Sequence, residues 1–145
     1  MIVPRNSLFV NTSGWAYLLD RHDPLHQSIN AIYQTTLKQR RTLVTTNYIL
    51  AELVPLLASR SRLPRQQIFA FVDALKIAPH VAIIHVDAEL DRRTWELLKA
   101  RIDKEWSFVD ASSFVVMNIY GIQEAITTDH HFTQAGFIRL PHQNT

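Results

Sequence analysis

With 145 residues, 47% of them hydrophobic, the chain is long enough for one domain with a sizeable core, which we expect to span residues 1–145. It has no cysteine, which excludes disulfides and thiolate metal ligands, and its net charge of +2 does not by itself indicate a nucleic-acid partner. No run approaches ~18 apolar residues, and the N-terminal MIVPRNSLFV lacks the continuous apolar stretch of a signal peptide, so we expect a cytoplasmic protein without a membrane segment.

Short apolar runs alternate along the chain with longer segments of helical period. We expect strands near residues 7–10, 42–45, 81–86, 124–127 and 137–140. Apolar positions at helical spacing predict helices around residues 25–37, 47–57, 68–75, 90–102 and 109–120. Pro64 suits the first turn of the helix around 68–75, whereas Pro55 predicts a kink or an early break. This alternation is typical of a parallel sheet with crossover helices.

Four polar residues stand at comparable places after the expected strands. Asn11 follows the first strand, Glu52 lies in the helix after the second, Asp110 begins a helix, and Asp129 follows the strand that ends in AITT. Ligands of open parallel sheets bind outside the carboxyl ends of the strands. We therefore expect Glu52, Asp110 and Asp129 to converge with residue 11.

Each of these residues also has a purely structural interpretation. Asn11 suits a turn before Thr-Ser-Gly, and Glu52 suits the solvent-facing side of a largely apolar helix. Ser107-Phe-Val-Asp110 has the form of a capping box, and Asp129 suits an ordinary loop. Taken singly, each structural interpretation is the stronger one, because short patterns match by chance.

Their combination favours a metal site. Carboxylates about 4 Å apart repel by about 4 kcal/mol per pair at an effective dielectric near 20, and a divalent cation removes that cost. Oxygen ligands without cysteine favour Mg²⁺ or Mn²⁺ over zinc, and such ions also accept phosphate oxygens. The histidines receive no metal site here, because His22 and His26 flank Asp23-Pro24, where a regular helix is not assured. His130 and His131 are expected in an exposed loop at the mouth of the acidic site.

Four strings, FVNTSGW, TTNYILAEL, WSFVDASSF and AITTDHHF, together resemble the PIN-domain nucleases, especially the ribonuclease toxins of VapBC-type toxin-antitoxin pairs. The resemblance covers roughly residues 7–140. It implies a three-layer α/β/α fold with a central parallel sheet of four to five strands and a Mg²⁺ or Mn²⁺ site at the carboxyl edge of the sheet. Carried over position by position, it assigns catalytic and metal-binding roles to Asn11, Glu52, Asp110 and Asp129, and cofactor-binding roles to the supporting hydroxyls of Thr12, Ser13 and Ser113.

Residue 11 departs from the family pattern, because PIN-domain nucleases usually carry Asp there. The resemblance thus implies a metal-dependent endoribonuclease that is attenuated or inactive through Asn11. Asn11 is either an introduced change that allowed a toxic nuclease to be produced or the natural residue of a silenced enzyme, and we favour the first because the other acids are intact. A non-catalytic binding protein and a metal-dependent phosphatase or DNA nuclease are the alternatives.

The resemblance also implies partners. These are an RNA substrate, tRNA or another structured RNA, a second copy of the chain in a homodimer, and a small antitoxin that places an Arg or Lys at the acidic site. We expect the contact surface over residues 24–60, where Tyr33, Tyr48 and Leu56-Leu57 exceed the needs of internal packing. Trp15, Trp95 and Trp106 are expected to pack internally rather than to stack on bases.

Overall fold

The computed structural model describes residues 3–142, so the two ends of the expected domain, 1–2 and 143–145, lie outside the described residues. The elements in chain order are β1 (Leu8–Val10), α1 (Thr12–Leu19), α2 (His26–Lys38), β2 (Leu43–Thr46), α3 (Asn47–Ser59), α4 (Arg65–Ile77), β3 (Val81–Ile84), α5 (Ala88–Ala100), α6 (Phe108–Tyr120), β4 (Glu124–Ile126), α7 (His130–Gln134) and β5 (Ile138–Leu140). All five expected strands and all five expected helices are present.

The five strands form one parallel sheet in the order β3-β2-β1-β4-β5. Central β1 and its neighbour β2 are buried throughout, which explains the wholly apolar sequence of β1 and the apolar start of β2 before its two buried threonines. Successive strands are added in one direction from β1 to β3, and then in the opposite direction from β4 to β5. The order therefore reverses between β1 and β4, and the crevice at their carboxyl ends is the place where such sheets bind ligands.

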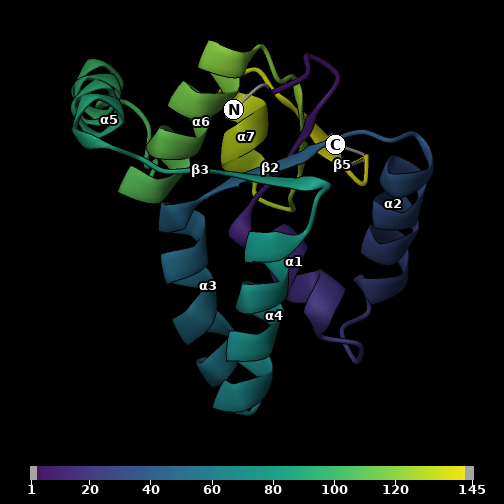
Figure 1. Cartoon of the computed structure of the whole chain (residues 1–145). Helices are drawn as coiled ribbons and strands as arrows, with labels where there is room; N and C mark the ends of the chain where they lie inside the picture. The colour runs from purple at the N-terminus through teal and green to yellow at the C-terminus, as the bar shows by residue number, and fades with distance from the viewer. Residues whose placement is uncertain (1–2, 143–145) are drawn as a thin grey trace.

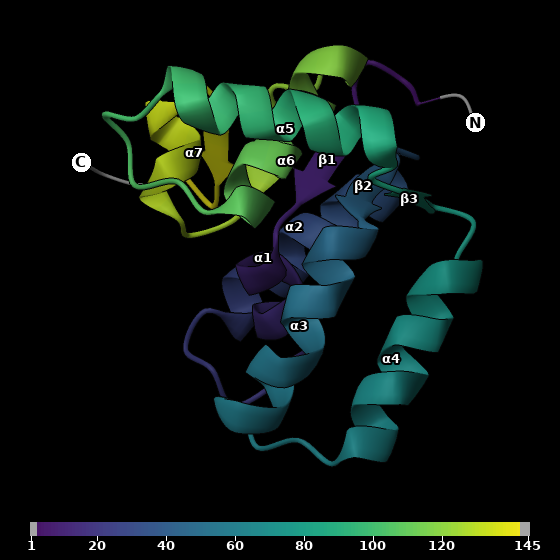
Figure 2. The same ribbon diagram turned by 90° about the vertical axis from the view of Figure 1, so that its left-hand side faces the viewer.

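The reversal also explains the layers. Right-handed crossovers that run in opposite directions place their helices on opposite faces of a sheet. Figure 1 accordingly shows α5, α6 and α7 on one side of the sheet, with α1, α3 and α4 on the other, and the turned view of Figure 2 agrees. The predicted three-layer α/β/α fold with a central parallel sheet is confirmed.

Helix α1 was not predicted, because Asn-Thr-Ser-Gly reads as a turn. Gly14 lies in its first turn, and a Cβ there would stand 2.6 Å from the carbonyl oxygen of Ile126. The glycine thus serves close packing of α1 on the end of β4 rather than an unusual backbone angle. Asn11 is the N-cap residue, in extended conformation with φ −81° and ψ 170°, so the expected turn is absent.

Two further expectations about helices need correction. The early break, one of the two outcomes expected at Pro55, is absent because α3 continues to Ser59, where the Ser59 hydroxyl donates to the Pro55 carbonyl oxygen at 2.8 Å. His130 and His131 are not loop residues, because they open the short helix α7 behind its N-cap Asp129. Pro64 directly precedes α4.

The expected contact surface over residues 24–60 is only partly exposed. Leu57 is fully buried, and Tyr33, Tyr48 and Leu56 are half-buried. Tyr48 donates to Asp91 of α5 at 2.8 Å, and this hydrogen bond raises the pKa of the Tyr48 hydroxyl. The exposed large hydrophobic residues of the described chain are Phe69, Ile77, Trp95, Ile102, Ile119 and Ile138.

The three tryptophans also differ in exposure. Trp15 and Trp106 are buried as expected, whereas Trp95 is 54% exposed beside the ring of Phe108.

Between residues 3 and 142, no helix combines the length and the apolar character that crossing a membrane requires.

Candidate active site

Asn11 and Thr127 join β1 to β4 where the strand order reverses. The Asn11 side-chain amide donates to the Thr127 hydroxyl oxygen at 3.0 Å, and the backbone amide of Asp129 donates to the same oxygen at 3.0 Å. With both of its lone pairs engaged, the Thr127 hydroxyl donates its own proton to Ser13 Oγ, 3.3 Å away. Asn11 is 5% exposed, and its side chain reaches across the sheet edge instead of capping α1.

Glu52 is held by the residue that follows Asn11. The Thr12 hydroxyl donates to Glu52 Oε1 at 2.6 Å, which ties the second turn of α3 to the first turn of α1. Glu52 is exposed, as its structural interpretation predicted, while Thr12 is buried. Among the described residues, no hydrogen bond or ion pair joins Glu52 directly to Asp110 or Asp129.

Asp110 contacts two different residues, Ser107 of the capping box and His131 of α7. It forms the predicted capping box of α6, since Ser107 Oγ accepts from the Asp110 backbone amide at 3.0 Å and Asp110 Oδ2 accepts from the Ser107 backbone amide at 3.2 Å. The same Oδ2 lies 3.0 Å from Nδ1 of His131. Capping is therefore only part of the environment of this carboxylate, which is buried at 8% exposure.

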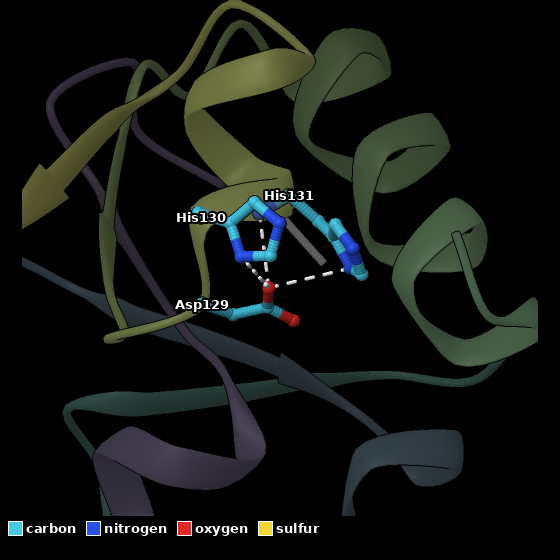
Figure 3. Close-up of side chains that lie close together, drawn as sticks. All are labelled: Asp129, His130 and His131. Carbon is cyan, nitrogen blue, oxygen red and sulfur yellow. Dashed lines mark hydrogen bonds and ion pairs between the residues drawn. The ribbon is translucent and has the colours of Figure 1, made fainter. Parts of the chain in front are cut away.

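His131 joins the last two acids of the predicted set. Its Nδ1 lies 3.0 Å from Asp110 Oδ2 and 3.3 Å from Asp129 Oδ1, and its backbone amide donates to that Asp129 oxygen at 2.9 Å. Figure 3 shows the rings of His130 and His131 side by side above the Asp129 carboxylate, where α7 begins. Asp110 and Asp129, 19 positions apart along the chain, thus meet on one imidazole.

The donor atoms of the four predicted residues suit a hard cation. Each residue keeps one side-chain oxygen that accepts no hydrogen bond from the described residues, and these oxygens are Asn11 Oδ1, Glu52 Oε2, Asp110 Oδ1 and Asp129 Oδ2. Their other side-chain polar atoms are fixed by the contacts above. Oxygen ligands of this kind are those that Mg²⁺ and Mn²⁺ prefer, and three of the four carry charge when ionised.

The three predicted hydroxyl residues differ in their contacts. Thr12 and Ser13 lie within the network, and Ser13 Oγ also accepts from the Thr128 backbone amide at 3.3 Å. Ser113 is fully buried and donates to the Val109 carbonyl oxygen at 3.1 Å, a contact within α6 that gives no support to its predicted supporting role.

Thr127 was not predicted as a site residue. It is fully buried, and its hydroxyl is hydrogen-bonded to the Asn11 side chain, the Ser13 hydroxyl and the Asp129 backbone amide. A signal was present in AITTD, where two hydroxyl residues separate a buried strand from the acid.

A parallel sheet of this order, with Asp110 and Asp129 joined through His131, agrees with the predicted class of protein. The chain belongs to the PIN domain family, which it matches over residues 8–138. Two curated relatives, each named 23S rRNA-specific endonuclease VapC20 and coming from the CDC 1551 / Oshkosh and H37Rv strains of Mycobacterium tuberculosis, are 33% identical over 133 residues, which is 92% of this chain and 97% of theirs. The resemblance to VapC-type toxins is thereby confirmed.

Solved structures agree. The crystal structure of M. tuberculosis VapC20, described as a Sarcin-Ricin loop cleaving toxin, superposes with a TM-score of 0.80 at 35% identity, over 91% of this chain and 97% of that one. FitAcB from Neisseria gonorrhoeae has a TM-score of 0.62 at 17% identity, over 91% and 95% of the two chains, and this likeness shows the fold alone.

Proposed function

We propose that the chain is a metal-dependent endoribonuclease of the VapC type, attenuated by Asn11. The observation that supports the proposal is that Asn11, Glu52, Asp110 and Asp129 each keep one side-chain oxygen that accepts no hydrogen bond from the described residues. We propose that these oxygens face one cation. A divalent ion, when bound, supplies positive charge that neutralises a phosphodiester and acidifies water. Asp110 and Asp129 would hold this ion directly or through water.

The other residues position the reacting groups. Thr12 fixes one oxygen of Glu52 and leaves the other free to orient a water molecule or to take its proton. Thr127 fixes the Asn11 amide so that Oδ1, its remaining oxygen, is the potential ligand. These contacts hold Glu52 and Asn11 in defined directions before any substrate binds, which is how an active site limits the cost of ordering its groups.

Asn11 lowers the affinity for the cation because an amide oxygen replaces a charged carboxylate oxygen. Removing a partner even from the outer shell of a metal site typically costs ~10- to 100-fold in affinity or activity. We infer a loss of at least this size relative to an acid at residue 11. The non-catalytic alternative has one supporting observation, namely that the Asn11 amide is fully integrated as a donor to Thr127.

The substrate class follows from the relatives. VapC20 is named for 23S rRNA cleavage at the Sarcin-Ricin loop, and the present chain matches almost its full length. We propose a structured rRNA loop as the substrate, with tRNA as the competing RNA. By the same relationship, we propose that the chain forms a homodimer and binds a small antitoxin whose Arg or Lys pairs with Asp110 and Asp129.

The direct test uses Asn11→Asp and Asn11→Asp/Asp110→Asn proteins with Mg²⁺ or Mn²⁺. Their substrates are an rRNA loop fragment, tRNA, single-stranded DNA and a small phosphomonoester. We expect Asn11→Asp to cleave RNA, with activity abolished by a chelator and by the second substitution. Hydrolysis of the phosphomonoester alone, or cleavage of DNA in preference to RNA, would replace the proposed activity by another hydrolase activity. No hydrolysis of any substrate would favour the non-catalytic interpretation.

A further inference from the structure

The start of α7 presents two adjacent histidines that the proposed function does not use. Asp129, His130 and His131 each offer one ligand atom, and these three atoms lie within 4.8 Å of one another. His130 Nδ1 is 3.9 Å from Asp129 Oδ1, and the two imidazole rings are 4.4 Å apart between centroids. Asp110 adds a fourth potential ligand from α6, 3.0 Å from His131 Nδ1.

Two of these spacings are close to those between neighbouring ligands of a tetrahedral metal site. Zinc binds imidazole nitrogen and carboxylate oxygen at about 2.0–2.2 Å, so neighbouring ligand atoms around it stand about 3.3 Å apart. The two distances from His131 Nδ1, 3.0 Å to Asp110 and 3.3 Å to Asp129, already lie near that value. His130 is the more distant ligand, but its side chain is 67% exposed and is therefore free to rotate inward.

The ligand types separate this site from the hard-cation site. Imidazole nitrogen favours Zn²⁺, Co²⁺ and Ni²⁺, whereas Mg²⁺ takes oxygen ligands and keeps several waters. We propose that His130, His131, Asp129 and Asp110 form a binding site for one transition-metal ion of the Zn²⁺ class. This ion would use Asp110 Oδ2 and Asp129 Oδ1, the oxygens nearest His131. Its positive charge would repel a second divalent ion at the remaining oxygens of the same carboxylates, so the two ions compete.

Occupation of this site has a functional consequence that rests on the proposed nuclease activity. A Zn²⁺-class ion bound by two imidazoles of α7 would weaken the binding of Mg²⁺ or Mn²⁺ to Asp110 and Asp129 through charge repulsion. Such an ion therefore acts as an inhibitor of the enzyme.

Titration of the metal-free chain with Co²⁺ tests the site without reference to RNA cleavage. Four-coordinate Co²⁺ with imidazole ligands absorbs visible light far more strongly than octahedral Co²⁺. We expect a strong spectrum that saturates at one ion per chain and that a large excess of Mg²⁺ does not remove. His131→Gln and His130→Gln should each weaken binding by at least ~10-fold, while the matched control His22→Gln, at an exposed histidine outside the cluster, should leave it unchanged.

Three results would overturn the proposal. These are a weak octahedral spectrum, displacement of Co²⁺ by an equal concentration of Mg²⁺, or equal affinity in all three histidine variants. Far-UV circular dichroism of each variant confirms that it is folded. Because the readout is the spectrum of Co²⁺, failure here leaves the nuclease proposal standing, and failure of RNA cleavage leaves the transition-metal site standing.

Discussion

The side-chain amide of Asn11 donates to the buried hydroxyl of Thr127 at 3.0 Å, across the two strands between which the sheet order reverses. The direction of this hydrogen bond depends on residue 11. An aspartate at the same place would accept from Thr127, whose hydroxyl would then turn away from Ser13, and Ser13 would become the donor of that pair. The network therefore accommodates either residue by rotating two hydroxyl groups, without movement of the backbone.

Thr127→Val tests this network. The substitution preserves shape but leaves the Asp129 backbone amide and the Asn11 amide without their acceptor, and each unsatisfied buried donor costs about 1–3 kcal/mol. We expect the free energy of unfolding in urea to fall by about 2–5 kcal/mol in total, allowing for partial access of water. Thr127→Ser, which keeps the hydroxyl, is the matched control and should lose less than half as much. Equal losses in the two variants would show that the methyl group, not the hydroxyl, is the important part.

Gly14→Ala tests the close approach of α1 to β4. The added Cβ would meet the Ile126 carbonyl oxygen at 2.6 Å, and this oxygen belongs to the backbone and cannot rotate away. Overpacking of this kind costs about 1–3 kcal/mol, although alanine is the better helix former. Ser28→Ala, at an exposed position of α2, provides the control and should change stability little. Stability would be compared by thermal unfolding of both variants and of the unsubstituted chain. A Gly14→Ala protein more stable than the unsubstituted chain would refute the packing argument.

Ser107→Ala separates capping from metal binding at Asp110. Loss of the Ser107 hydroxyl removes one half of the capping box and should reduce stability by about 0.5–2 kcal/mol. The Asp110 carboxylate keeps its charge and its contact with His131. In the Asn11→Asp background we therefore expect Ser107→Ala to lower the melting temperature while changing Mn²⁺ affinity far less than Asp110→Asn does. If Ser107→Ala and Asp110→Asn lowered Mn²⁺ affinity by similar amounts, Asp110 would affect metal binding through its role in capping α6 and not as a ligand.

The elements that the sequence predicted share long, regular signals. The strands at 43–46 and 81–84 are runs of β-branched and apolar residues, and the α2, α3 and α6 helices each carry more than two turns of apolar spacing. Helix α1 was missed because the local preference of Asn-Thr-Ser-Gly for a turn was outweighed by packing of Gly14 against β4. Helix α7 has five residues, too few to show a helical period.

The candidate site, too, could be predicted from the sequence only in part. The rule that parallel strands end at one edge directed attention to Asn11 and Asp129, which follow β1 and β4, whereas Glu52 and Asp110 lie within helices and depended more on the family resemblance. It did not predict that His131 would join Asp110 to Asp129, because that contact depends on how α6 and α7 pack, through rings such as those of Phe114 and Phe132. Side-chain partners of this kind follow from tertiary packing and leave no periodic signal along the chain.

Calorimetric titration with Mn²⁺ tests the central claim, that the four residues form one cation site weakened at residue 11. It compares the present chain with Asn11→Asp and with Asn11→Asp/Asp110→Asn. Restoring the carboxylate adds a fourth negative charge that attracts the divalent ion beside the three remaining acids, so we predict binding at least ~10-fold tighter in Asn11→Asp and loss of that gain in the double variant. Equal Mn²⁺ affinity in the present chain and in Asn11→Asp would contradict the account, because residue 11 would then be no part of a metal site.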